Sequence, residues 1–174
     1  MTLLDSENCL IFCFGPACAD YLSVPNVLTR SVWSHIVVTF DTGTLTVYKD
    51  TLALQGATAY GTFPNALLTG TANDRFQVSD LAGPFAGYLD EIAVWDRALN
   101  TTEIAMAYNL GYAIDYINNP TLKNGLKAWY RFGDFEAVLT TNNVPDQSDT
   151  STNNDLVYQG AQIPNVMGQF TKFR

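Results

Sequence analysis

Hydrophobic and polar residues alternate along several parts of the chain, and this period of two predicts β-strands. One of these parts covers residues 88–95 and carries apolar side chains on both of its faces. A strand of this kind is expected between two layers of the structure. One face holds Leu89, Glu91, Ala93 and Trp95, and the other holds Tyr88, Asp90, Ile92 and Val94.

A second alternating pattern predicts a β-hairpin. Residues 31–40 and 44–49 flank a short Asp-Thr-Gly connection, which is typical of a hairpin turn. An apolar run at residues 9–14, ended by a Gly-Pro pair, predicts a buried strand. Shorter strands are expected at residues 21–24, 52–54, 67–69, 75–78 and 156–158, with a loop over residues 56–64.

Residues 100–111 predict one short helix. Asn100 is a favourable N-cap residue, and Glu103 three positions later completes a capping box. Gly111 is expected to end the helix as its C-cap. The apolar face is expected to consist of Ile104, Ala105, Ala107, Tyr108 and Leu110.

Residues 126–132 alternate again and predict a strand in the last third of the chain. After this strand, residues 133–154 are rich in Asp, Asn, Ser and Thr, and a loop of this length inside a domain is usually functional or mobile. The predicted inward face of the strand consists of Leu126, Ala128, Tyr130 and Phe132, while Lys127, Trp129 and Arg131 point the other way.

The composition is that of an all-β protein. Of the 174 residues, 47% are hydrophobic and 13% aromatic, whereas only 15% are charged, a balance typical of strand-rich domains. The net charge of −8 disfavours binding to nucleic acid and to anionic membranes, which both need basic surfaces. No run approaches the ~18 apolar residues of a membrane span, so membrane insertion is not expected.

The N-terminal residues and the cysteines indicate a reducing compartment. Residues 1–8 lack the basic and apolar regions of a secretory signal, unless the sequence is a fragment or a processed form. The chain has an odd number of cysteines, namely Cys9, Cys13 and Cys18. We therefore expect them to be reduced and buried as small hydrophobic residues. A zinc site would need a fourth ligand, and His35, the single histidine, is expected on a strand beside a neighbouring partner.

Several of these stretches resemble one family. Gly-Tyr-Leu-Asp-Glu-Ile at residues 87–92, Arg-Ala-Leu at 97–99 and Glu-Ile at 103–104 are similar to the end of a laminin-G-like, concanavalin A-type jelly-roll domain. Residues 33–41 and 45–50 resemble two consecutive strands of the same family. The resemblance implies an all-β fold, a jelly-roll β-sandwich with one short helix. This fold hosts lectins, glycosidases and structural modules, so it implies little about function.

The motif that opens such a domain follows the motif that closes it. Gly-Leu-Lys-Ala-Trp-Tyr-Arg-Phe-Gly-Asp at residues 125–134, Asp-Gln-Ser at 146–148 and Asn-Asn-Asp at 153–155 resemble the family's opening. Three explanations remain open: a circular permutation, a piece of a tandem array, and strand exchange in a homo-oligomer. We predict a main sandwich segment over residues 1–114, a connection over 115–124, and an opening-like segment over 125–174 that packs on the same or a neighbouring sandwich.

The order of the motifs resembles that of jelly-roll segments in structural proteins of marine bacteriophages. This resemblance implies a non-enzymatic structural or attachment component of a virion, such as a capsid decoration, tail or fibre protein. Such a component would assemble in the host cytoplasm as a homo-oligomer or with other virion proteins. The alternative is a lectin-like, carbohydrate-binding module, outside the cell or at its surface, that binds cell-surface glycans.

A glycoside hydrolase is a third and weaker hypothesis. Glycosidases of this fold class carry paired carboxylates on one face of an inner strand, so that both flank the same sugar. Asp90 and Glu91 are adjacent in the sequence, and adjacent residues of a strand point to opposite faces. We therefore predict that the protein is not an enzyme.

Two kinds of binding residue are candidates. Calcium prefers hard oxygen ligands on loops, although Asx residues also form turns and cap backbone groups. Exposed aromatic rings could stack on sugars, and Trp129, Tyr60 and Tyr112 are the candidates for this role. The calcium candidates are Asp90, Asp134, Asp146, Asn153 and Asp155, together with Asp149 and Asn154.

Overall fold

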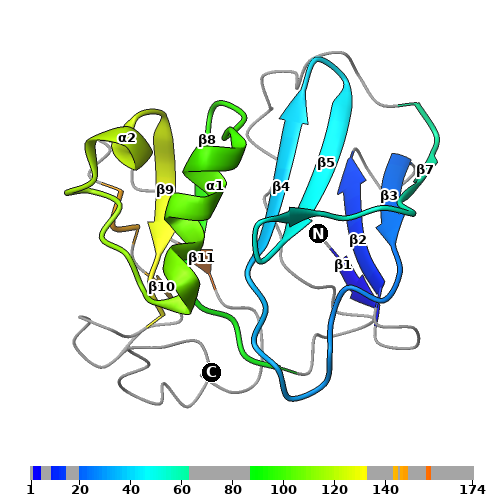
Figure 1. Cartoon of the computed structure of the whole chain (residues 1–174), viewed down its shortest axis with the longest axis horizontal. Helices are drawn as coiled ribbons and strands as arrows, with labels where there is room; N and C mark the ends of the chain where they lie inside the picture. The colour runs from blue at the N-terminus through cyan, green and yellow to red at the C-terminus, as the bar shows by residue number, and fades with distance from the viewer. Residues whose placement is uncertain are drawn as a thin grey trace. The chain divides into compact units, whose positions relative to one another are not determined.

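The computed structural model describes residues 2–4, 9–14, 20–62, 87–132, 143–144, 146–148 and 156–157 (Figure 1). The chain divides into two units, Met1–Gly87 (unit 1) and Tyr88–Arg174 (unit 2). Every strand pair in the described residues is antiparallel. This agrees with the all-β class that the alternating sequence pattern predicts.

Unit 1 contains two antiparallel sheets, one with strand order β1-β2-β3-β7 and one with order β4-β5-β6. The first sheet consists of β1 (Thr2–Leu4), β2 (Cys9–Phe14), β3 (Asp20–Val24) and β7 (Thr58–Tyr60). The second consists of β4 (Ile36–Asp41), β5 (Thr44–Lys49) and β6 (Leu52–Ala53).

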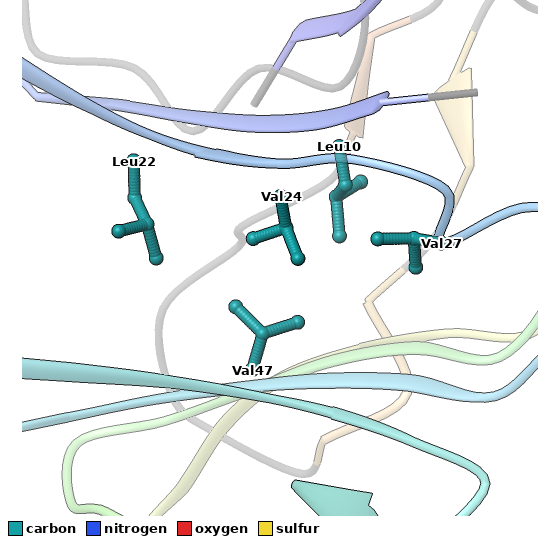
Figure 2. Close-up of a cluster of buried hydrophobic side chains, with 5 residues drawn as sticks. All are labelled: Leu10, Leu22, Val24, Val27 and Val47. Carbon is teal, nitrogen blue, oxygen red and sulfur yellow. The ribbon is translucent and has the colours of Figure 1, made fainter. Parts of the chain in front are cut away.

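An aliphatic core lies between the two sheets of unit 1. Val47 on β5 points toward Leu10 on β2 and toward Leu22 and Val24 on β3, as Figure 2 shows. Val27, just after β3, closes one end of this cluster. Leu22 and Val24 both reach the core because residues two apart on a strand share a face. Unit 1 is therefore a β-sandwich in which each sheet buries one face.

The predicted hairpin is confirmed, although its first strand is shorter than expected. β4 and β5 pair along their whole lengths and are joined by a two-residue turn at Thr42 and Gly43. The strand does not begin at residue 31 because the chain turns there. The amide of Val32 donates to the carbonyl oxygen of Thr29 at 3.1 Å, and Ser31 has a φ of 62°.

Other predictions for unit 1 have mixed outcomes. The strands expected at residues 9–14, 21–24 and 52–54 are confirmed as β2, β3 and β6. The loop expected over residues 56–64 was wrong in part, because β7 lies within it and pairs with β3. The strands expected at residues 67–69 and 75–78 lie outside the described residues.

The cysteines depart from the expectation of a fully reduced set. Cys9 is a buried thiol, as predicted. Cys13, in contrast, is disulfide-bonded. Cys18 lies outside the described residues. Disulfides persist in oxidising surroundings, which include virion and cell surfaces, so the cysteines no longer argue for a reducing compartment.

Unit 2 is built around a two-stranded antiparallel ribbon of β8 (Ile92–Trp95) and β9 (Leu126–Tyr130). Between these strands the chain forms α1 (Thr101–Tyr108), a 3-10 turn (Asn109–Gly111) and α2 (Pro120–Lys123). A second ribbon pairs β10 (Asn143–Val144) with β11 (Leu156–Val157), the latter confirming the strand expected near residue 156.

The ribbon is apolar on both faces, as the sequence predicts for an inner strand. On one face, Ala93 and Trp95 pack with Trp129 and with residues of α1 and α2. On the other face, Ile92 and Val94 pack against a cluster that includes Val144 of β10. β8 is shorter than predicted because Glu91 adopts a φ of 51°, which L-residues do not adopt in strands.

A β-bulge corrects the predicted faces of β9. Val94 pairs with Ala128 whereas Trp95 pairs with Leu126, so Lys127 is an extra residue in the ladder. Leu126 consequently joins the same cluster as Trp129 instead of sharing a face with Ala128. The strand also ends at Tyr130, two residues earlier than expected.

The capping box at the start of α1 is confirmed. The side chain of Asn100 accepts from the amide of Glu103, and the Glu103 carboxylate accepts from the amide of Asn100. The predicted C-terminus was wrong, because Asn109 adopts the left-handed conformation and caps the helix before Gly111 is reached. Ala105 and Leu110 are exposed, so they do not belong to the buried face.

Candidate functional site

The closing and opening motifs meet in unit 2. β8 belongs to the closing motif and β9 to the opening motif, and the two strands pair with each other. At the end of β8, the indole Nε1 of Trp95 donates to the carbonyl oxygen of Leu122 at 2.7 Å. The amide of Asp96 donates to the carbonyl oxygen of Gly125 at 2.9 Å. Gly125 has a φ of 79°, and a Cβ there would lie 2.6 Å from the Asp96 carboxylate, so this contact requires glycine.

Arg97 extends this junction. Its Nε donates to the carbonyl oxygen of Asn124 at 2.9 Å, and its Nη2 donates to that of Thr121 at 3.2 Å. Its Nη1 lies 2.8 Å from Oε2 of Glu103, the residue that also closes the capping box. The hydrogen bond from Arg97 lowers the pKa of Glu103, and the same bond raises the pKa of Arg97. One guanidinium therefore ties α1 to the segment that leads into β9.

A buried carboxylate lies at the start of the ribbon. Oε2 of Glu91 accepts from Nε1 of Trp129 at 2.6 Å, and Oε1 accepts from Nε of Arg131 at 3.2 Å. The guanidinium of Arg131 also stacks over the Trp129 ring, 4.9 Å from its centroid. The ring of Tyr116 packs against those of Trp95 and Trp129, with centroids 5.3 and 5.1 Å apart. We refer to Glu91, Trp129, Arg131 and Tyr116 as the Glu91 cluster.

Burial dominates the electrostatics of this cluster. Burial raises the pKa of Glu91 to about 7, although its hydrogen bonds to Trp129 and Arg131 and the charge of Arg131 oppose the shift. The nearby Asp90 raises it further. Burial also raises the pKa of Tyr116, and the charge of Glu91 acts in the same direction. A perturbed carboxyl of this kind is a feature of active sites, but structural ion-pair networks also produce it.

The surroundings of Glu91 favour the structural interpretation. Its side chain is only 5% exposed and is held by an indole and a guanidinium. Asp90, one of the calcium candidates, uses Oδ1 to accept from the backbone amide of Glu91 at 2.9 Å. This geometry holds the end of β9 in place. Among the residues that the structure describes, it does not form a pair of carboxylates that flank an open site.

Sequence reasoning missed Arg131 and Tyr116 as members of this cluster. Glu91 and Arg131 lie 40 positions apart in the chain. The signal that could have found the pair is the strand register. Ala93 faces Trp129, and Glu91 and Arg131 stand two positions from these residues, just outside the ends of β8 and β9.

The calcium candidates are described only in part. Oδ1 of Asp146 accepts from the amides of Trp129 and Ser148, each at 2.9 Å, so this residue does make the backbone contacts of an Asx turn. Asp134, Asn153 and Asp155 lie outside the described residues, as do Asp149 and Asn154. Across the described part of the chain, no three His, Cys, Asp or Glu side chains gather in a way that would hold a metal ion. Calcium binding stays a prediction.

The three aromatic candidates differ in exposure. Trp129 was expected at the surface, but it is only 3% exposed and its indole is bonded to Glu91, so this expectation was wrong. Tyr60 and Tyr112 are each 46% exposed, as a role in sugar stacking requires. Glycan binding by either residue stays a prediction.

The single histidine contacts its neighbour through the backbone. The amide of His35 donates to Oδ1 of Asp50, and its carbonyl oxygen accepts from the amide of Asp50, both at 2.9 Å. Burial lowers the pKa of His35, while the charge of Asp50 opposes the shift. His35 precedes β4 by one residue, so the expected strand position was wrong by that amount.

The strands and the buried motif contacts together define an antiparallel β-sandwich fold with two short capped helices, α1 and α2, where the sequence predicted one. A laminin G-type family model, described as the concanavalin A-like lectin/glucanases superfamily, matches residues 2–105. The match covers more than half of the 174-residue chain, and the chain belongs to this superfamily. The predicted concanavalin A-like jelly-roll fold is thereby confirmed. Searches of curated proteins and of solved structures gave no match.

Family membership limits the range of functions but does not choose among them. A concanavalin A-like, laminin-G-type domain is compatible with a lectin-like role and with a structural role. None of the helices in the described residues has the length and apolar character needed to span a membrane.

Proposed function

We propose that the chain is a non-enzymatic structural and attachment component of a virus particle, such as a capsid decoration, tail or fibre subunit. The observation that carries the proposal is that side chains of the closing and opening motifs make their contacts inside the domain. Trp95, Arg97, Glu103 and Trp129 bond to other groups within unit 2, so they hold the domain together. The resemblance of the motif order to bacteriophage structural proteins supports the viral setting.

The disulfide at Cys13 also fits a particle component. Disulfides persist at virion surfaces and outside cells, so a subunit that assembles in the host cytoplasm and works on a released particle is compatible with this bond. The partners of such a subunit are further copies of the chain or other virion proteins.

The pairing of β8 with β9 fits a circular permutation, and strand exchange would use the same pairing between two copies of the chain. The Arg97 and Trp95 contacts link the same two segments, and we propose that the permutation accounts for the motif order. In this interpretation, the segment over 125–174 completes its own domain. The predicted boundaries at residues 114 and 125 stay a prediction.

The mass of the purified chain in solution tests the proposed function. Light scattering with and without a chelator should show a stable trimer or larger assembly whose mass the chelator leaves unchanged. A monomer that loosens or unfolds when calcium is removed would contradict the proposal and favour the lectin-like alternative.

A cysteine pair at positions 94 and 128 separates permutation from strand exchange. Val94 and Ala128 are register partners, and residues directly opposite on antiparallel strands are close enough for a disulfide. In Val94→Cys/Ala128→Cys, oxidation should close a bond within one chain, leaving the denatured mass that of a monomer. The single variant Val94→Cys is the control. Covalent multimers formed by the double variant alone would show strand exchange instead.

A lectin-like, carbohydrate-binding module is the second candidate function. The exposed rings of Tyr60 and Tyr112 favour it, because aromatic rings with a polar tip are suited to amphipathic ligands such as sugars. Such a module would act outside the cell or at the cell surface, and in its calcium-dependent form the Asx-rich loop over residues 133–154 would bind the ion. Retention on a glycan array that a chelator abolishes would support the calcium-dependent form.

A further inference from the structure

Two tyrosines form a stacked pair at one edge of the first sheet of unit 1. β7 is the last strand of the order β1-β2-β3-β7, and Figure 1 shows it beyond β3. Tyr21 on β3 and Tyr60 on β7 are register partners, so they stand directly opposite each other on one face of the sheet. Their ring centroids are 4.5 Å apart, and the ring planes differ by 17°. Carbon atoms of the two phenol rings are therefore in van der Waals contact.

The backbone next to this pair is fixed as well. Oδ1 of Asp20, the residue before Tyr21, accepts from the amide of Thr62 at 3.0 Å. Gly61 has a φ of 80°, and a Cβ at this position would overlap the Asp20 carboxylate, so only glycine allows this approach. β7 pairs with β3 through three residues, and the bond to Thr62 extends this attachment past Tyr60. The two rings are thereby held in one relative position.

The pair is open to solvent and lies beside an oxidised cysteine. Tyr60 is 46% exposed, so an oxidant reaches its ring. Cys13 on β2 is the register partner of Tyr21 from the other side, and Cys13 is disulfide-bonded. Disulfides persist where thiol reductants are scarce. The same reductants would quench a tyrosyl radical, so surroundings that keep the disulfide closed also allow such a radical to react further.

We propose that Tyr21 and Tyr60 are the site of a dityrosine cross-link, formed when a haem peroxidase with hydrogen peroxide oxidises the pair. Each phenol gives up one electron and its hydroxyl proton and becomes a neutral phenoxyl radical, whose unpaired electron spreads to the ring carbons next to the hydroxyl. One such carbon of each ring forms the new C–C bond. The hydrogen on that carbon then moves to the oxygen and restores the phenol. The peroxide takes up the two electrons and two protons and is reduced to water.

The ring contact favours coupling within one chain over coupling between chains. The partner ring is already in place, so its effective concentration is far above that of any protein in solution. The new bond would join β7, a three-residue edge strand, to β3. A cross-link between segments far apart in the sequence restricts the unfolded chain and stabilises the fold, as a disulfide does. Thiol reductants open the Cys13 disulfide, but they do not cleave a C–C bond.

Peroxidase treatment of matched variants tests this site. Treated wild-type protein should lose the mass of two hydrogen atoms, gain dityrosine fluorescence and keep the mass of a single chain after denaturation and reduction. Peptide mapping should find residues 21 and 60 joined. Tyr60→Phe keeps the ring without the phenol hydroxyl, so it should lose the cross-link altogether, and Tyr21→Phe should do the same. Tyr112→Phe is the matched control, because Tyr112 is also 46% exposed, and this variant should keep the wild-type yield.

The stability of the treated protein gives a second readout. The midpoint of urea unfolding should shift to higher urea after treatment, and the shift should remain when a thiol reductant is present. Wild type that keeps both hydrogens, an equal yield in Tyr60→Phe, or coupling of other tyrosines in place of this pair would each overturn the proposal. Covalent dimers without the link inside one chain would overturn it too. The proposal is independent of both candidate functions, which the mass of the assembly and the glycan array test separately.

Discussion

Units 1 and 2 differ in what holds them together. The core of unit 1 consists of aliphatic side chains that enter from two facing sheets. In unit 2, the ribbon of β8 and β9 packs with the rings of Trp95, Trp129 and Tyr116. A Glu91–Arg131 ion pair and the capping glutamate Glu103 are buried there as well. A two-stranded ribbon is marginal by itself, so side chains must supply what additional strands supply in unit 1.

The difference explains where the recognisable motifs lie. An aliphatic core needs only the right pattern and volume, and it tolerates exchange among Leu, Ile and Val. The contacts of unit 2 depend on particular donors and acceptors, such as the indole of Trp95 and the guanidinium of Arg97. Residues that match the closing and opening motifs are therefore concentrated in unit 2, where they act as structural links.

The largest expected effect comes from truncating the centre of unit 2. Trp129→Ala removes a buried ring and leaves Glu91 without its shortest hydrogen bond, so the free energy of unfolding should fall by about 3–5 kcal/mol. Val47→Ala, its counterpart in the core of unit 1, removes less volume and no polar partner and should cost roughly 2 kcal/mol. Urea unfolding followed by circular dichroism measures both losses.

Hydrogen exchange then shows whether the two units depend on each other. In Trp129→Ala, amides of β8 and β9 should lose protection, while those of β4 and β5 keep it if unit 1 is stable by itself. Equal loss of protection in both units would show that the chain unfolds as one cooperative structure. The contrast between the two units would then be wrong.

The second prediction uses the pH dependence of Glu91. Its pKa is raised to about 7 in the fold, above the ordinary value of 4.5. Between these two pH values the unfolded chain releases a proton that the folded chain retains, so this carboxyl lowers stability as pH rises. Its contribution is most favourable below pH 4.5, and it declines by about 3 kcal/mol up to pH 7.

Glu91→Gln removes this dependence and keeps a carbonyl oxygen for one of the two donors, Trp129 or Arg131. The stability of wild type relative to the variant should therefore fall between pH 4.5 and 7 and stay constant outside this range. The contributions of other acids to the pH dependence of stability are the same in wild type and variant, so they cancel in the difference. These acids include Glu103 and Asp115, whose lowered pKa values make stability rise with pH. A difference that does not change with pH would show that Glu91 is ionised throughout, held by Arg131.

Local features of the fold could be predicted from the sequence. The capping box joins Asn100 and Glu103, three residues apart, and the hairpin turn at Thr42 and Gly43 joins adjacent strands. Each depends on residue types within a few positions, so the pattern contains the whole interaction. The exposure of Tyr60 could also be predicted, although its stacking on Tyr21 could not.

Features that depend on distant pairing could not be predicted. The burial of Trp129 follows from the register between β8 and β9 and from the bulge at Lys127, neither of which leaves a local signal. The end of α1 was misplaced because Asn109 competes with Gly111 for the left-handed cap, and both residue types suit it. The Glu91 cluster required both the register and the turn of the chain at Glu91.

The prediction with the smallest effect on the free energy of unfolding compares two charged contacts within unit 2. One is the set of bonds made by Arg97, and the other is an ordinary surface ion pair. Arg97→Ala removes a guanidinium with three partners and leaves Glu103 buried without it, so it should cost about 2 kcal/mol in urea unfolding. Lys127→Ala breaks a pair with Asp96 whose side chains are 55% and 51% exposed, and it should cost less than about 0.5 kcal/mol. Equal losses in the two variants would mean that the Arg97 contacts add nothing beyond surface charge. The motif side chains would then lose the structural role on which the proposed function depends.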